Sequence, residues 1–274
     1  MSVINYTKPG AICNAADNEL LNNDDFIAVG ENTIIKELSA MGYTLRKADF
    51  SDILNIINFM NIRYKDFPPQ VVSDVSQYDI YRFIEFGHGL VIEDTNRNIV
   101  ASVFEEPYNS IDKTSYTVRI ASDLNLVGKN LGYYITLYSC ILAYKNKSKV
   151  KRALIAANNY ASATILINKM GWLADGFNLS YFPNIGPAFS VCLPLTKSGL
   201  LENRLSTPKL LEFIKTKQLN VDFRLIKCDD YTEIDYMYNI EKKFVIAAYL
   251  KQGIYDNANY YVALPYKVLH IKYK

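Results

Sequence analysis

The sequence is poor in the side chains that build metal and redox centres. It has only two histidines, His88 and His270, and its four cysteines lie far apart with no C-x-x-C pair. The cysteines are Cys13, Cys140, Cys192 and Cys228. Zinc sites and redox-active disulfides need such residues at close spacing. We therefore expect no metal cofactor and a reducing, cytoplasmic compartment.

The chain also lacks a strong charge of one sign and long apolar runs. Its 30 Lys and Arg residues against 28 Asp and Glu residues give a net charge of +2, which is too small for nucleic-acid binding by bulk electrostatics. No apolar run reaches the roughly 18 residues that span a bilayer. No N-terminal stretch has the pattern of a cleaved signal peptide. We expect no nucleic-acid partner and no membrane span, although export without a cleaved signal would leave no trace in the sequence.

The composition is otherwise that of a folded protein. With 274 residues, 50% of them hydrophobic and 21% charged, the chain can bury one large core or two moderate ones. Residues 1–42 are expected to form an N-terminal extension. Residues 1–32 show no sustained periodicity, and a short helix over residues 31–41 ends at Gly42.

From Tyr43 to Leu195 the hydrophobic pattern alternates between strand and helix spacing. The expected order is strand, two helices, three strands, helix, strand, helix and two strands. The strands are expected at residues 43–48, 89–93, 99–104, 115–121, 152–157, 177–181 and 188–193, and the helices at 53–60, 76–86, 131–144 and 161–170. Residues 94–98 form a turn, so the second and third strands make a hairpin.

The most informative segment follows the fourth strand. Residues 123–132, Asp-Leu-Asn-Leu-Val-Gly-Lys-Asn-Leu-Gly, form a polar loop that opens an apolar helical run. A helix N-terminus leaves backbone N–H groups unpaired and carries a positive partial charge, so such a loop can hold a pyrophosphate. The alternative is an ordinary helix start preceded by a turn glycine.

This order of elements resembles the GNAT superfamily, whose members transfer an acyl group from acyl-coenzyme A to an amine. The resemblance implies an α/β (α+β) fold with a mixed, mostly antiparallel central sheet flanked by helices. The family's Q/R-x-x-G-x-G/A loop wraps the coenzyme A pyrophosphate and is matched here by residues 127–132. Val127 and Asn130 replace two signature residues, while Gly132 is retained. Asn130 is compatible with the turn because Asn enters left-handed conformations readily.

The resemblance implies that acetyl-coenzyme A or another acyl-coenzyme A is the co-substrate. Its contacts would come from the end of the fourth strand, the loop and one residue after the fifth strand. These residues are Ile120, Ala121, Ser122, Val127, Gly128, Lys129, Asn130, Leu131, Gly132, Tyr133 and Asn159. In the family, a backbone N–H on the fourth strand, here near residues 120–122, polarises the thioester carbonyl.

A second segment, residues 158–172, is similar to the family's N-x-x-(A/S)…K-x-G-F pattern. Counting back from Gly171 puts Tyr160 where the family has Asn, with Asn159 one residue early. The same register puts Ile167 where many members carry the tyrosine that protonates the departing thiolate. The alternative interpretation is an Asn-Asn turn followed by an amphipathic helix.

Acyl transfer requires a neutral amine, a polarised thioester carbonyl and a proton for the leaving thiolate. The catalytic candidates are Tyr116, which takes the place of a family Glu, Asp123 and Tyr160. Glu105 and Glu106 are further carboxylates close in sequence, and the alternative is that all the carboxylates are solvated loop residues. His88, between two glycines, is expected to be exposed, and Cys140 to be a small core residue.

Residues 196–274 are expected to form a C-terminal α/β extension. A helix is expected from Thr207 and a strand at 223–230, then a helix at 232–244 and a strand pair at 260–264 and 267–271. Residues 225–229 echo the opening strand, so this extension is interpreted as a truncated GNAT-like half-unit. Chance recurrence of a strand, an acidic cap and a helix is the alternative.

Three functional hypotheses follow from the sequence. The first is an acyl-coenzyme A-dependent N-acyltransferase acting on an amine of a small molecule, peptide or protein. The second is a GNAT-fold regulatory protein that binds acyl-coenzyme A without efficient catalysis, which the altered positions Val127, Asn130 and Ile167 favour. The third is an interaction protein with a macromolecular partner. The chain is expected to be a monomer or a homodimer.

Overall fold

The computed structural model describes residues 23–65, 76–86, 89–106, 111, 113–182, 186–195 and 223–265. The chain divides into two compact units. The N-terminal unit is Pro9–Ala153 with Pro194–Leu201, and the C-terminal unit is Met1–Lys8 with Leu154–Leu193 and Glu202–Lys274. The expected helix from Thr207 and the expected strand at 267–271 lie outside the described residues.

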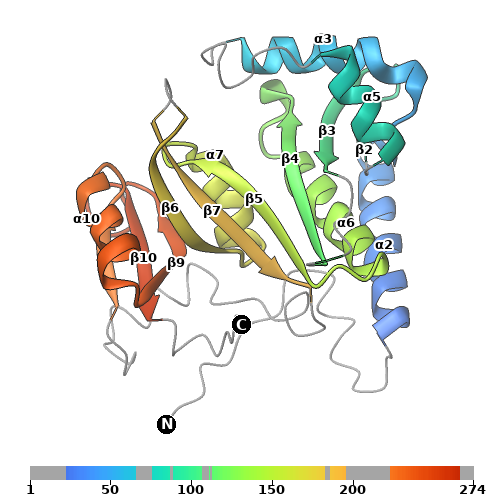
Figure 1. The fold of residues 1–274 in the computed structure, drawn as a ribbon. Coiled ribbons are helices and arrows are strands. Elements are labelled where there is room, and N and C mark those ends of the chain that lie inside the picture. The colour runs from blue at the N-terminus through green and yellow to red at the C-terminus, as the bar shows by residue number, and fades with distance from the viewer. Residues whose placement is uncertain are drawn as a thin grey trace. The chain divides into compact units, whose positions relative to one another are not determined.

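The N-terminal unit contains strands in the order β1-β2-β3-β4-β5 (Figure 1). They are β1 (Thr44–Lys47), β2 (Gly89–Glu93), β3 (Ile99–Glu105), β4 (Thr114–Ser122) and β5 (Val150–Ala156). Strands β1 to β4 pair antiparallel, and β4 pairs with β5 in parallel. The boundary between the units falls within β5, after Ala153.

Four helices pack in the described part of this unit. They are α2 (Asn23–Ala40), α3 (Ile53–Tyr64), α5 (Gln77–Phe86) and α6 (Leu131–Lys145), with short 3-10 turns η2 (Phe50–Asp52) and η3 (Leu124–Leu126). Helices α3 and α5 share a core with the sheet because Ile56 and Met60, one turn apart, face Phe104. Helix α6 contacts β2, β3 and β4, and α2 contacts α6 and β1.

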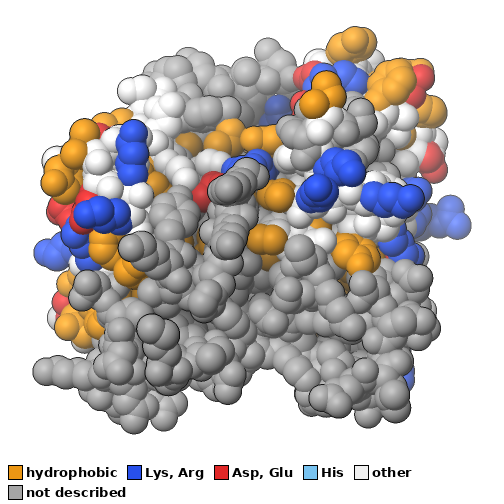
Figure 2. Space-filling view, turned by 60° about the horizontal axis from the view of Figure 1, so that its bottom comes forward, with side chains coloured by type: hydrophobic (Ala, Val, Ile, Leu, Met, Phe, Trp, Pro, Cys, Tyr) orange, Lys and Arg blue, Asp and Glu red, His pale blue; other side chains and the backbone are white. Residues whose placement is uncertain are grey.

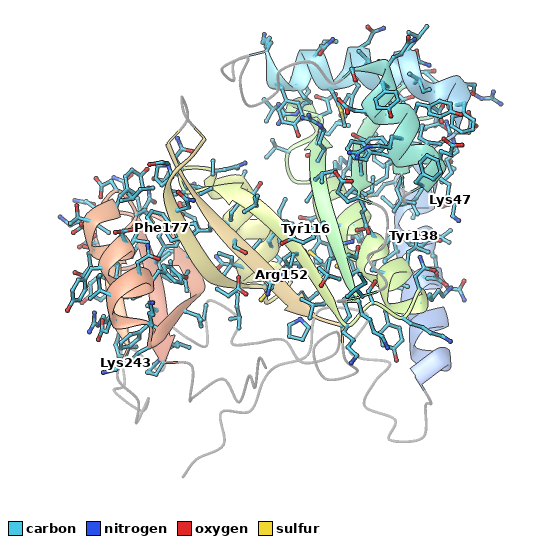
Figure 3. All side chains as sticks on the ribbon, in the orientation of Figure 1. Lys47, Tyr116, Tyr138, Arg152, Phe177 and Lys243 are labelled. Atoms are coloured by element: carbon cyan, nitrogen blue, oxygen red, sulfur yellow. The ribbon has the colours of Figure 1, made fainter. Side chains whose placement is uncertain are left out.

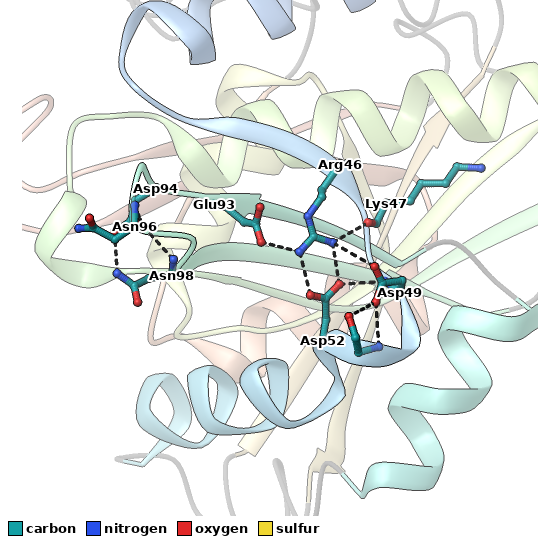
Figure 4. Close-up of polar contacts among 9 residues, drawn as sticks. Arg46, Lys47, Asp49, Asp52, Glu93, Asp94, Asn96 and Asn98 are labelled. Atoms are coloured by element: carbon teal, nitrogen blue, oxygen red, sulfur yellow. Dashed lines mark hydrogen bonds and ion pairs between the residues drawn. The ribbon is translucent and has the colours of Figure 1, made fainter.

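A network of charged side chains fixes the start of α3 (Figure 4). The Arg46 guanidinium donates to both carboxylate oxygens of Asp52, at 2.6 and 2.7 Å, and to Glu93 at 2.5 Å. Asp52 also accepts from the Asp49 N–H, while Asp49 caps the Ser51 N–H, which completes a capping box. The bond to Arg46 lowers the pKa of the largely buried Asp52.

A second ion pair lies entirely inside the N-terminal unit. Lys151 on β5 donates to Glu105 on β3, and both side chains are almost fully buried, with exposed fractions of 0% and 1%. The Ser115 hydroxyl on β4 donates to the other Glu105 oxygen at 2.5 Å. Three neighbouring strands are therefore joined through one carboxylate. Glu105 is thus a buried structural group and not a solvated loop residue.

In the C-terminal unit the strand order is β5-β7-β6-β9-β10-β8. The strands are β6 (Leu173–Phe182), β7 (Gly186–Pro194), β8 (Arg224–Lys227), β9 (Phe244–Leu250) and β10 (Tyr260–Pro265). Two helices accompany them. The first is α7 (Tyr160–Ala163), which continues into the π-helix η4 (Thr164–Lys169), and the second is α10 (Tyr231–Asp235), which continues into the π-helix η5 (Tyr236–Glu241).

These elements form two copies of one β-α-β-β motif, which we call the paired repeats: β5-α7-β6-β7 and β8-α10-β9-β10. In each copy the third strand lies between the first and the second, and the copies join where β6 pairs antiparallel with β9. Each helix has an Asx N-cap followed by a tyrosine, namely Asn159 before Tyr160 and Asp230 before Tyr231.

The copies also exchange aromatic contacts. Tyr160 stacks on Tyr249 of β9 at 5.3 Å between ring centroids, and Tyr231 stacks on Phe177 of β6 at 6.3 Å. The sequence predicts that residues 225–229 repeat the opening strand. The structure shows a further similarity, between β8-α10 and β5-α7.

Most expected elements are present, with three differences. Helix α2 begins at Asn23, within the stretch where the sequence shows no sustained periodicity. The helix expected at 161–170 is only partly α-helical, because six of its residues adopt a π-helix. The helix expected at 232–244 ends at Glu241, and β9 follows directly.

The surface of the described residues adds two observations. None of the described helices is both long enough and apolar enough to cross a membrane. On the face shown in Figure 2, the Lys and Arg side chains of the described residues form separate small groups and not one continuous patch.

Candidate functional site

The candidate site begins at the C-terminal half of β4. Pairing between β4 and β5 runs from Thr114↔Val150 to Thr117↔Ala153. The Asp123 N–H donates to the Val100 carbonyl, in line with the β3–β4 register. Because backbone groups alternate along an antiparallel strand, those of Ile120 and Ser122 point away from β3. The Ile120 carbonyl accepts instead from the Tyr64 hydroxyl of α3 at 2.8 Å.

The loop after β4 turns through left-handed backbone conformations. Gly128 has φ 95° and Asn130 has φ 57°. The sequence predicts that Asn130 tolerates such a conformation, and its backbone angle confirms this. A side chain at Gly128 would meet nothing within 4 Å, and the Val127 side chain is 82% exposed. The loop therefore presents open backbone and few side-chain obstacles.

Helix α6 starts immediately after this turn. Leu131 and Gly132 are buried, and the N–H groups at the first positions of a helix have no acceptor within the helix itself. The Asn130 side chain makes no capping hydrogen bond to these groups. Lys129, just before the turn, is exposed and carries a positive charge. An anion at this helix start would meet backbone donors, the helix dipole and this cation.

The second segment lies in the C-terminal unit and is described there alone. Asn159 caps α7 by accepting from the Ser162 N–H at 3.1 Å, so its side chain already has a structural role. Burial raises the pKa of Tyr160 to about 12, so this phenol stays protonated at neutral pH. Ile167, which the sequence resemblance places at the position of the thiolate acid, is buried in η4.

The candidate catalytic residues of the N-terminal unit differ in their exposure and in their hydrogen-bond partners. Tyr116 lies on β4 opposite Arg152 and is 41% exposed, so it can reach a ligand (Figure 3). Asp123 caps η3 by accepting from the Asn125 N–H at 2.9 Å, which gives it a structural role. Glu106 pairs with Arg82 at 2.9 Å on the surface.

The remaining candidates are a histidine and a cysteine. His88 lies outside the described residues. Cys140 is fully buried, and burial raises the pKa of its thiol to about 12. A protonated, inaccessible thiol is a poor nucleophile, which agrees with the expected core role.

The element order from β1 to β7 is strand, two helices, three strands, helix, strand, helix and two strands, apart from the short turns. This is the element order that the sequence predicts for residues 43–195. No protein-family model matches the sequence, and no curated protein matches it. Solved structures of N-acetyltransferases do resemble it.

A chain of the NatC complex bound to Gag peptide and CoA is 15% identical, with a TM-score of 0.48 over 56% of this chain and 99% of that chain. The ribosomal-protein-S18-alanine N-acetyltransferase from Escherichia coli is 14% identical, with a TM-score of 0.47 over 56% and 94%. Ard1 from Thermoplasma volcanium is 12% identical, with a TM-score of 0.47 over 57% and 99%. Likeness at this level concerns the fold alone.

Two residues beside the site were not expected from the sequence. Tyr64 contacts β4 at Ile120, and Arg63 precedes it at the end of α3. Burial raises the pKa of the Tyr64 hydroxyl. No signal in the sequence singles them out, because both lie in a helix whose apolar face alone is recognisable.

Proposed function

We propose that this protein is an acyl-coenzyme A-dependent N-acyltransferase that acts on an amine of a small molecule, peptide or protein. The observation that carries the proposal is the end of β4 and its loop. There, backbone groups turned away from β3 lead directly into a left-handed turn and the start of α6. A thioester carbonyl is polarised by a free backbone donor, and a pyrophosphate binds the unpaired N–H groups of a helix N-terminus.

In the proposed complex, the N–H groups of Leu131 and Gly132 bind the pyrophosphate, with Lys129 as a further cation. An N–H of the segment Ile120–Ser122 polarises the thioester carbonyl, so this role does not depend on side-chain identity. Tyr116 contacts the acceptor.

Coenzyme binding is tested by a matched pair of variants at the turn. Asn130→Gly keeps the left-handed conformation, whereas Asn130→Val penalises it by about 1–2 kcal/mol. We expect coenzyme A to bind Asn130→Gly like the wild type and to bind Asn130→Val roughly tenfold more weakly, measured by isothermal titration calorimetry. Absence of saturable coenzyme A binding to the wild type would refute the proposal.

Catalysis is tested separately by thiol release from acetyl-coenzyme A across a panel of amines. We expect at least one amine to raise thiol release above the rate measured without an amine. If no amine in the panel does so, the protein is not an N-acyltransferase for these acceptors.

A second candidate function is supported by the apolar position of Ile167 and by the engagement of Glu105 in a buried ion pair. It is a regulatory protein that binds acyl-coenzyme A without turning it over. Tight coenzyme binding with no thiol release above background for any amine would favour this candidate over the enzyme.

A further inference from the structure

An open cavity of about 340 Å³ lies in the N-terminal unit, outside the proposed coenzyme loop. One side is formed by a face of α3, including Asn58 and Arg63. The others are formed by the turn between β2 and β3, with Arg97 and Asn98, and by the residues just after β4. Its lining includes Asp123 and Asn125, at the start of the loop after β4, but none of residues 127–133, which are proposed to bind the coenzyme.

Arg63 contributes a donor that has no acceptor. Its side chain is half-buried, and its Nε atom is inaccessible and makes no hydrogen bond with the described residues. Buried donors are almost always satisfied, because an unpaired one loses its hydration without compensation. Nε itself is closed to a ligand, so an acceptor in this cavity would be bound by the outer amino groups of the guanidinium.

Arg97, in the turn between β2 and β3, occupies an unusual backbone position. Its φ of 64° is left-handed, a conformation that favours glycine or asparagine. The turn is held by Asp94, whose carboxylate accepts from the Asn96 and Asn98 N–H groups at 2.9 and 2.8 Å (Figure 4). The Arg97 N–H donates to the Asp94 carbonyl at 3.0 Å. A strained position in an ordered turn thus carries a long cation beside the cavity.

The charge balance of the lining favours an anion. Arg63 and Arg97 provide two guanidinium groups, and Asp123 provides the only carboxylate among the lining residues. One Asp123 oxygen is already used by the Asn125 N–H. The remaining polar lining consists of asparagine side chains, which donate as well as accept. Guanidinium groups match the planar, bidentate geometry of carboxylates and phosphates.

We propose that this cavity binds the carboxylate or phosphate group of a small molecule, with the outer amino groups of Arg63 and the guanidinium of Arg97 as donors. The anion has two sources. It is either a separate small acid or the 3′-phosphate of coenzyme A, and the second source rests on the proposed function. The two are distinguished below by their response to the same variants.

Binding is measured on the full-length protein by isothermal titration calorimetry with citrate and with inorganic phosphate. We expect at least one of the two anions to bind with a millimolar or lower dissociation constant. Binding should be at least tenfold weaker in Arg63→Gln and in Arg97→Gln. Arg63→Lys should lose less affinity, because lysine keeps the positive charge but lacks the paired donors of the guanidinium group. Lys147→Gln, which removes an exposed cation elsewhere in the same unit, is the control and should bind like the wild type. Far-UV circular dichroism verifies that each variant is folded.

Titrations with coenzyme A and with dephospho-coenzyme A show whether the bound anion is the 3′-phosphate of coenzyme A or a separate small acid. If the 3′-phosphate occupies the cavity, the wild type prefers coenzyme A and Arg63→Gln abolishes that preference. If a separate acid occupies it, Arg63→Gln binds coenzyme A normally and citrate binds to the coenzyme-saturated protein. Anion binding without any coenzyme A binding would refute the proposed function and retain this site. Equal anion binding by the wild type and Arg63→Gln, or none by the wild type, would overturn the site.

Discussion

The buried ion pair between Glu105 and Lys151 gives the sharpest test of how the N-terminal unit is held together. The substitution Lys151→Met keeps most of the side-chain volume and removes the ammonium group. Glu105 would then be left as a carboxylate with an exposed fraction of 1% and, among the described residues, only the Ser115 hydroxyl as a donor. Removing one partner of a buried ion pair typically costs about 3–5 kcal/mol, because the remaining charge is neither solvated nor paired.

The double variant Glu105→Gln with Lys151→Met separates the charge effect from a packing effect. Glutamine still offers an acceptor to Ser115, and no charge remains buried. We expect the double variant to recover most of the stability lost in Lys151→Met, since replacing a buried pair by neutral groups is often close to neutral. The matched control is Lys145→Met, which breaks the more exposed pair with Glu31 and should cost less than about 1 kcal/mol.

Urea unfolding followed by far-UV circular dichroism measures these differences. A loss of 3–5 kcal/mol lowers the midpoint of Lys151→Met by about 1–2 M urea at a typical m-value, while the m-value itself stays constant. A loss below about 1 kcal/mol in Lys151→Met would refute the reasoning. So would a double variant whose loss equals the sum of the two single losses, because the charges would then be uncoupled.

Three further outcomes are expected. Arg46→Met should lose about 2–3 kcal/mol at pH 7, because Asp52 and Glu93 stay largely buried without their partner. Arg46 lowers the pKa of Asp52, so the stabilisation of the fold by this ion pair is present above the usual Asp pKa and is lost as the pH falls through the lowered value. The difference in unfolding free energy between Arg46→Met and the wild type should therefore be smaller at pH 3 than at pH 7. An unchanged difference would contradict this. In a Cys13→Ser background, thiol labelling at pH 8 should be at least about 100-fold slower in the native protein than in urea, because Cys140, Cys192 and Cys228 are buried; fast labelling of any native thiol would contradict the burial. Asp230→Ala should destabilise the protein by about 1 kcal/mol in urea unfolding, because the Glu233 N–H loses its cap; an effect below about 0.3 kcal/mol would show that the cap contributes nothing.

Local chemistry explains which parts of the fold were predictable. Strand β2 has the predicted bounds, since a short apolar run between glycine and a polar turn has few alternatives. The left-handed Asn130 was predictable for the same reason, because few residues other than glycine adopt that conformation easily. Signals of this kind involve neighbouring residues, so they can be read from one sequence.

Other features depend on residues far apart in the chain. Strand β9 was not predicted, because its apolar run does not alternate and its burial depends on pairing with β6 and β10. The role of Glu105 depends on Lys151, 46 residues away. In the candidate cavity, Arg63 and Arg97 belong to different elements, and nothing in either local sequence indicates the other.

The paired repeats have a consequence for how the C-terminal unit assembles. Two copies of one motif that join through equivalent strands reproduce the contact that identical subunits make about a two-fold axis. Here both copies belong to one chain, so the effective concentration of each for the other is set by the linking segment and not by the amount of protein in solution. The β6–β9 contact and the exchanged stacking of Tyr160 and Tyr231 should therefore persist at any dilution.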